Sequence, residues 1–190
     1  MEETTQTTYP SLVRRVTLVI AAVIFAGIGA LIAFGLFQLQ NNPGNSPSTG
    51  DMEPAPDFTA PLYSGGDGDF TLSDHLGSPV VVNFWGSWCP PCRAEFPALQ
   101  AVANEYKDRG LIVFGVDVQD TEENARAFLE EQNTTFLTGP DITGQISLDY
   151  QVLSMPTTYF VTRDGRILRS WAGQIDEARL TTFIEEILNT

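Results

Sequence analysis

The only two cysteines of this 190-residue chain stand three positions apart in the segment WGSWCPPC, residues 85–92. A valine-rich run at residues 79–84 comes directly before this segment, and a helical pattern of apolar residues follows from Cys89 to Arg109. Continuous apolar runs are typical of strands buried on both faces, and the helical pattern indicates one face packed on a core. The sequence therefore predicts a dithiol at the junction between a buried strand and an amphipathic helix.

The rest of the C-terminal part alternates between strand patterns and helix patterns. We expect a strand at residues 111–118, a helix at 120–132, strands at 157–162 and 166–172, and a final helix at 176–188. Asp120 and Glu123 fit the start of the first of these helices, and Asp164–Gly165 fits a tight turn between the last two strands. This order predicts an α/β fold with a central mixed β-sheet flanked by helices.

Two cysteines this close in sequence could form a structural disulfide, bind a metal or exchange disulfides. A structural disulfide is disfavoured, because a disulfide stabilises a fold more when it closes a longer loop, and this loop is minimal. A structural zinc site needs four ligands, whereas the chain offers two Cys and one distant His, His75. We expect no metal, no bound cofactor other than a redox-active Cys89–Cys92 disulfide, and a surface or turn position for His75.

The start of a helix also predicts which cysteine reacts first. Free N–H groups and the helix dipole favour a thiolate at Cys89. Pro90 and Pro91 carry no N–H, so the backbone amide of Cys92 is the expected donor to the Cys89 sulfur. We expect Cys89 to be exposed and to attack, and Cys92 to be shielded and to resolve the mixed disulfide.

The N-terminal region is predicted to anchor the chain in a membrane. Residues 16–38 contain no charge, and about 20 apolar residues are enough to cross the hydrocarbon core. The run is longer than the apolar part of a signal peptide and no convincing cleavage site follows it, so we expect an uncleaved anchor. Arg14 and Arg15 precede the anchor, which places residues 1–15 in the cytoplasm.

A linker and one globular domain are expected beyond the anchor. Residues 39–54 are rich in Pro, Gly, Ser and Asn and are predicted to form a flexible linker. Residues 55–190 would then fold as one extracytoplasmic domain at the cell membrane, held by a single-pass helix. The formal net charge of −14 does not suit nucleic acid, whose phosphates need a basic footprint. We expect no nucleic-acid partner and a monomer.

Two segments carry a family resemblance. Residues 82–97, VNFWGSWCPPCRAEFP, and residues 154–160, SMPTTYF, resemble the active-site segment and the cis-proline loop of the thioredoxin superfamily. More narrowly, the chain resembles the membrane-anchored, extracytoplasmic TlpA/ResA-like thiol–disulfide oxidoreductases over nearly all of residues 55–190. The resemblance implies a thioredoxin-like fold.

The resemblance also implies roles for single residues. Cys89 and Cys92 match the redox pair, and Pro156 matches a cis-proline that would present the Met155 backbone to an extended substrate strand. Trp85 is expected in the core. The residues expected to contact the substrate are Trp88, Pro90, Met155 and Pro156.

Glu95 matches an acidic residue near the active site of this subfamily. A carboxylate one turn past the pair can raise a thiol pKa by repulsion or relay a proton to it. The alternative is a first-turn glutamate that only favours the helix dipole. Cytosolic thioredoxin has a buried Asp where this chain has Asn83, which cannot take a proton, so Glu95 is the better relay candidate.

The predicted activity is reduction of protein disulfides outside the membrane. Family members include reductants of apocytochrome c, and the oxidised pair would be reduced again by a transmembrane electron donor. The alternatives are an oxidase or isomerase of exported proteins, and a non-catalytic chaperone that binds its client in the cis-proline groove. A peroxidase is disfavoured, because that branch carries Thr three positions before its reactive Cys and position 86 is Gly.

Overall fold

The computed structural model describes residues 52–190 and seven helical residues between positions 16 and 29. The predicted tail at 1–15 lies outside the described residues, as do most positions of the predicted anchor and linker. Within the part of the chain that is described, no helix is long and apolar enough to cross a bilayer. The predicted anchor and its boundaries therefore stay predictions.

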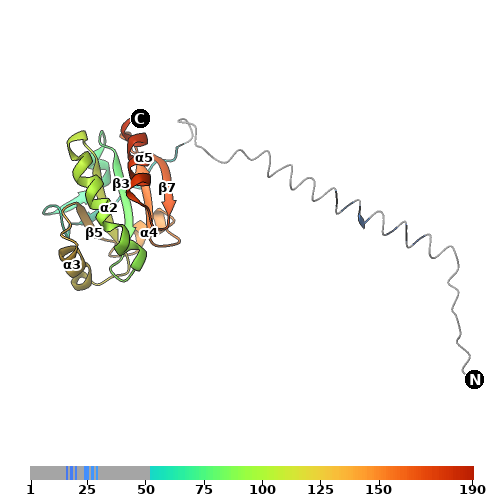
Figure 1. Ribbon diagram of the computed structural model, residues 1–190, viewed down its shortest axis with the longest axis horizontal. Coiled ribbons are helices and arrows are strands. Elements are labelled where there is room, and N and C mark those ends of the chain that lie inside the picture. The colour runs from blue at the N-terminus through green and yellow to red at the C-terminus, as the bar shows by residue number, and fades with distance from the viewer. Residues whose placement is uncertain are drawn as a thin grey trace, which may run out of the picture. The chain divides into compact units, whose positions relative to one another are not determined.

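A five-stranded mixed sheet forms the centre of the domain (Figure 1). Its strands are β3 (Val80–Trp85), β4 (Ile112–Asp117), β5 (Leu137–Pro140), β6 (Thr157–Val161) and β7 (Ile167–Ala172), in the spatial order β5-β4-β3-β6-β7. β3 pairs with β4 in parallel and with β6 antiparallel. All six residues of β3 are buried, as its valine-rich sequence predicts for a central strand. The predicted mixed sheet is confirmed.

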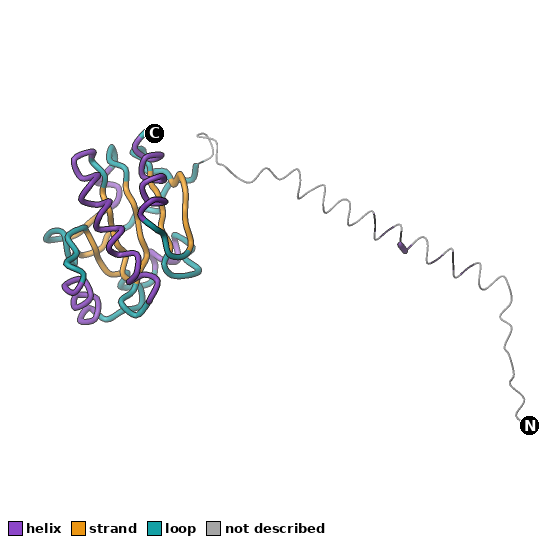
Figure 2. The backbone as a smooth tube through the Cα atoms, viewed as in Figure 1, coloured by secondary structure: helices purple, strands orange, loops and turns teal. Residues whose placement is uncertain are grey.

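Helices α2 (Pro90–Tyr106), α3 (Glu122–Glu131) and α5 (Glu177–Leu188) pack against one apolar cluster on one face of the sheet. Phe96 from α2, Phe128 from α3 and Leu180 from α5 meet in this cluster. Figure 2 shows the helices and the sheet as separate layers. The sequence spacing of buried residues on α2 follows the helical period, which is why the helix lies with one side on the sheet.

The second face of the sheet is covered by shorter elements that were not predicted. They are β1 (Thr59–Pro61), β2 (Asp69–Thr71), the 3-10 helix η1 (Leu72–His75) and α4 (Gln145–Asp149). Phe70 and Tyr150 belong to the apolar cluster on this face. His75 ends η1 and stacks on Phe70, with ring centroids 4.6 Å apart, which agrees with a turn position.

The predicted start of α3 at Asp120 is wrong by two residues. The helix begins at Glu122, and Thr121 caps it by accepting the N–H of Asn124 (3.2 Å). The Asp120 carboxylate is already engaged, because its two oxygens accept the N–H groups of Ser87 (2.7 Å) and Thr121 (2.8 Å). Asp120 thus connects the loop after β4 to the loop before α2.

Candidate active site

The dithiol lies where β3 gives way to α2. Cys89 is the N-cap residue of α2, and it forms a disulfide with Cys92 (S–S 2.04 Å). The backbone N–H of Cys92 donates to Cys89 Sγ at 3.3 Å, as predicted from the two prolines between them. The helix N-terminus therefore supplies both a direct donor and its dipole to the Cys89 sulfur, and both favour a thiolate there after reduction.

Both sulfurs are enclosed in this oxidised form. Cys89 is 3% exposed and Cys92 is fully buried, so the prediction of an exposed Cys89 is wrong. The cause is tertiary packing, because both cysteines belong to the apolar cluster of the α2 face and Met155 packs against that cluster. The predicted shielding of Cys92 is confirmed.

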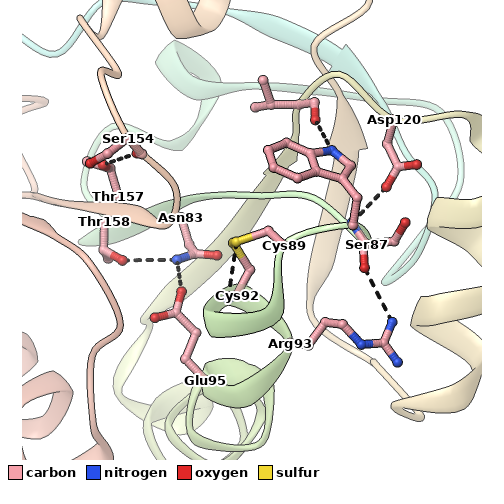
Figure 3. Close-up of a disulfide and its surroundings, with 12 residues drawn as sticks. Asn83, Ser87, Cys89, Cys92, Arg93, Glu95, Asp120, Ser154, Thr157 and Thr158 are labelled. Atoms are coloured by element: carbon pink, nitrogen blue, oxygen red, sulfur yellow. Dashed lines mark hydrogen bonds between the residues drawn. A yellow bond between two sulfur atoms is a disulfide. The ribbon is translucent and has the colours of Figure 1, made fainter.

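The loop that leads into α2 is held at Ser87 by two hydrogen bonds. Asp120 accepts the N–H of Ser87, and Arg93 Nη1 donates to the Ser87 carbonyl at 3.4 Å (Figure 3). Arg93 Nη2 also donates to both carboxylate oxygens of Glu131 of α3 (3.0 and 2.9 Å). These contacts fix the loop between β3 and α2, which a reacting pair needs for a defined geometry.

The two tryptophans of the active-site segment differ in exposure, and only the predicted core position of Trp85 is confirmed. Trp85 is fully buried in the core, whereas Trp88 is 53% exposed. The Trp88 indole N–H donates to the Val118 carbonyl at 3.2 Å. A side chain at Gly86 would oppose this arrangement, because a Cβ there would lie 2.6 Å from Trp88 Nε1. Gly86 thus makes room for the indole beside the dithiol.

The Met155–Pro156 peptide bond is cis, as the resemblance implies. Pro156 is buried directly before β6, and its carbonyl accepts the N–H of Gly173 at 2.8 Å. The next residue, Thr157, pairs with Phe84 on β3, so the cis-proline loop lies beside the strand that leads to the dithiol. Of the other predicted substrate contacts, Pro90 is exposed and Met155 is partly exposed.

Glu95 is buried on α2 and takes part in a polar network. Its Oε1 accepts from Asn83 Nδ2 (2.8 Å), and its Oε2 accepts the backbone N–H of Ile175 (2.9 Å). Asn83 Nδ2 also donates to Thr158 Oγ1 (2.9 Å), as Figure 3 shows. Glu95 is 1% exposed and lies beyond the first turn, so the alternative of a first-turn glutamate that only favours the helix dipole is wrong.

Burial raises the pKa of Glu95 to about 7, although the hydrogen bonds from Ile175 and Asn83 oppose that rise. The carboxyl therefore changes its charge near neutral pH, one helical turn from Cys92. A group with such a pKa can hold or release a proton in the pH range where disulfide exchange takes place.

Sequence reasoning missed a second buried carboxyl at this end of the sheet. Asp117 ends β4 and is 3% exposed. Burial, and then the charge of Asp120, raise the pKa of Asp117 to about 7. The available signal was an Asp within the otherwise apolar run LIVFGVDV, residues 111–118.

Comparison with known proteins places this geometry in a family. Residues 52–170 match the model of the AhpC/TSA family. The chain belongs to the AhpC/TSA family. Among similar proteins, the thiol-disulfide oxidoreductase ResA of Oceanobacillus iheyensis is 32% identical over 160 residues, which cover 83% of this chain and 82% of that protein. The thiol:disulfide interchange protein HelX of Rhodobacter capsulatus is 34% identical, with 85% and 90% covered.

A solved structure extends the likeness of this AhpC/TSA chain to its backbone. The thiol:disulfide interchange protein DsbE from Chlorobium tepidum superposes with a TM-score of 0.67 at 34% identity, covering 72% of this chain and 96% of that one. The thioredoxin-like fold is therefore confirmed, and the chain is a thiol–disulfide oxidoreductase.

Proposed function

We propose that this AhpC/TSA-family chain is a membrane-anchored, extracytoplasmic reductant of protein disulfides, with apocytochrome c as its client. The observation that carries the proposal is the Cys89–Cys92 pair at the N-terminus of α2. The Cys92 N–H donates a hydrogen bond to Cys89 Sγ, and the cis-Pro156 loop lies beside β3. The likeness to proteins named ResA, HelX and DsbE supports it.

The proposed reaction transfers two electrons in two exchange steps. The Cys89 thiolate attacks one sulfur of the client disulfide, which forms a mixed disulfide and releases the other client sulfur as a thiolate. Cys92 then loses its proton and attacks Cys89 Sγ, which releases the second client thiolate and leaves the Cys89–Cys92 disulfide. A dithiol electron donor in the membrane reduces this disulfide again.

Each site residue has a separate role in this proposal. Glu95 accepts the proton of Cys92 in the second step, because its raised pKa matches neutral pH and it lies one turn away. Met155 and Trp88 border the path of the client strand, and Pro156 exposes the Met155 backbone to it. Pro90 faces solvent at the start of α2, where the client would pass.

A Cys92→Ser variant tests the proposal. Without the resolving thiol, the mixed disulfide between Cys89 and the client should accumulate, because its only intramolecular exit is lost. We expect a band of higher mass on non-reducing gels that dithiothreitol removes, and mass spectrometry of that band to identify an apocytochrome c cysteine. Cys89→Ser/Cys92→Ser is the control and should trap nothing. Trapping of proteins other than cytochromes would contradict the proposed client.

A further inference from the structure

A cavity of about 840 Å³ opens at Trp88, the residue before Cys89, and has no role in the steps above. Its lining comes from five parts of the chain: Tyr63, Trp88 before α2, residues 117–120 at the end of β4, residues 140–144 and 147–148 around the start of α4, and residues 152–155 before the cis-proline. Trp88 and Met155 therefore belong both to the cavity and to the predicted path of the client. A client held at Cys89 would have this cavity next to it.

The rim of the cavity is apolar and exposed. Trp88, Ile142, Leu148 and Leu153 line it, and they are 53%, 76%, 69% and 97% exposed. Within residues 52–190, the only other exposed large hydrophobic residue is Leu76. Large exposed apolar groups gathered around one cavity mark an interaction surface rather than random surface composition.

The inside of the cavity is acidic. Asp117, Asp120 and Asp141 line it, and its lining contains no Lys, Arg or His. Two of these carboxylates are engaged within the fold: Asp120 accepts two backbone N–H groups, and Asp141 accepts those of Ile146 (3.2 Å) and Ser147 (2.8 Å). Both serve as anchors for loops and need no further partner.

Asp117 differs from its two neighbours. It is buried like Asp141, but its Oδ1 has no hydrogen-bond partner among the described residues. No ion pair within the described part of the chain includes it. The Trp85 indole N–H, on the paired residue of β3, has no partner either, so that donor does not reach Asp117. A buried carboxyl without a partner is costly, and a cation supplied from outside would offset that cost.

The acidic lining does not fit a metal ion. No group of three His, Cys, Asp or Glu residues within the described ranges is placed to hold one. One buried carboxyl without a partner below an apolar rim fits a long side chain with an apolar stem and a charged end, such as that of Lys or Arg. Its stem would contact the rim and its charged end would reach Asp117.

We infer that this cavity is a recognition subsite for a Lys or Arg side chain of the client, close in sequence to the client cysteine, with Asp117 as its counterion. The inference rests on the proposed function, because it assumes that a client segment passes Trp88 and Met155. It makes Asp117 a specificity-determining residue, separate from the exchange chemistry of Cys89 and Cys92.

The test measures binding and exchange separately, using the full-length chain. The probes are nonapeptides with a central Ser in place of the client Cys, in which a single Lys, Gln or Glu occupies each flanking position in turn. Isothermal titration gives their dissociation constants. We expect Lys to bind about tenfold more tightly than Gln at one or two positions, as for a charge-assisted contact, and Glu to bind most weakly.

Asp117→Asn should reduce the Lys-over-Gln ratio to below twofold. Asp67→Asn is the matched control, because Asp67 is an exposed aspartate of the β1–β2 loop outside the cavity lining, and it should keep the ratio. If the wild-type protein bound the Lys and Gln peptides equally at every flanking position, that result alone would overturn the inference, and no variant would be needed. A Lys preference that persists in Asp117→Asn would overturn it as well.

Reduction of the matching disulfide-linked peptides separates this inference from the proposed function. Exchange without a Lys preference at any position would overturn the subsite and leave the reductase proposal in place. A Lys preference that Asp117→Asn removes, together with no exchange, would support the subsite and contradict the reductase proposal.

Discussion

Replacement of Cys89 by serine is expected to lower the rate of disulfide exchange by at least about a thousandfold, because a serine hydroxyl does not replace a thiolate as the attacking group. The position of Cys89 explains this dependence. Its sulfur is the one that accepts the Cys92 amide at the N-terminus of α2. The rate can be followed as reduction of a fluorogenic disulfide substrate with dithiothreitol as the electron source.

Cys92→Ser is the matched comparison for this experiment. It removes a thiol of the same pair but leaves the attacking sulfur in place, so the first exchange step should persist as a single turnover. The result also decides between catalysis and client binding alone. If a Cys89→Ser chain kept full activity in cells, the protein would act as a chaperone and the exchange account would be wrong.

The second large effect is expected at Glu95. Its pKa in the folded chain is about 7, above the ordinary value of 4.5, so the folded state binds the proton more tightly than the unfolded state. This contribution to stability is complete below about pH 4.5 and is lost as the pH rises through 7. Glu95 alone should lower the free energy of unfolding by about 3 kcal/mol across that range.

A Glu95→Gln variant should remove that part of the pH slope. Gln does not titrate, so the free energy of unfolding from urea denaturation should fall by about 2.5 kcal/mol less between pH 5 and pH 8 in this variant than in the wild type. The slope is the decisive quantity rather than the stability at one pH, because the Gln amide cannot accept from both Asn83 and Ile175. Asp117 should contribute a slope of the same sign, which remains in this variant.

The same variant should change the thiols. An ionised Glu95 repels a thiolate one turn away, so its replacement should lower the pKa of Cys92 by about one unit, measured by thiolate absorbance in the reduced chain. Glu105→Gln removes an exposed glutamate of α2 and controls for the change in net charge. Unchanged thiol pKa values and exchange rates in Glu95→Gln would contradict a role for Glu95 in proton transfer.

Local patterns were sufficient for the main elements of this fold. Three of these patterns lie within short segments of sequence. They are the valine-rich run that predicts β3, the helical period that predicts α2, and Asp164–Gly165, which predicts a tight turn. β5 was not predicted, because it is only four residues long and contains Gly139 and Pro140, which are unusual in strands. Its pairing with β4 supplies what its own sequence lacks.

The site was only partly predictable for a related reason. Neighbouring residues in the sequence predict that Cys89 lies at a helix N-terminus. They also predict the hydrogen bond from the Cys92 N–H to Cys89 Sγ. The burial of Cys89 and the hydrogen bond from the Ile175 N–H to Glu95 both depend on contacts between segments that are far apart in the chain. No local sequence pattern predicts such contacts. Asp117 was missed because its importance comes from the cavity around it.

The reduction potential of the Cys89–Cys92 pair tests the central claim most directly, because both directions of electron flow use the same exchange chemistry. Equilibration of the full-length chain with glutathione or dithiothreitol buffers gives the potential. A reductant of client disulfides should have a value near that of thioredoxin, about −270 mV. A value near about −120 mV, typical of a strong oxidant, would contradict the proposed reductase and indicate an oxidase of exported proteins.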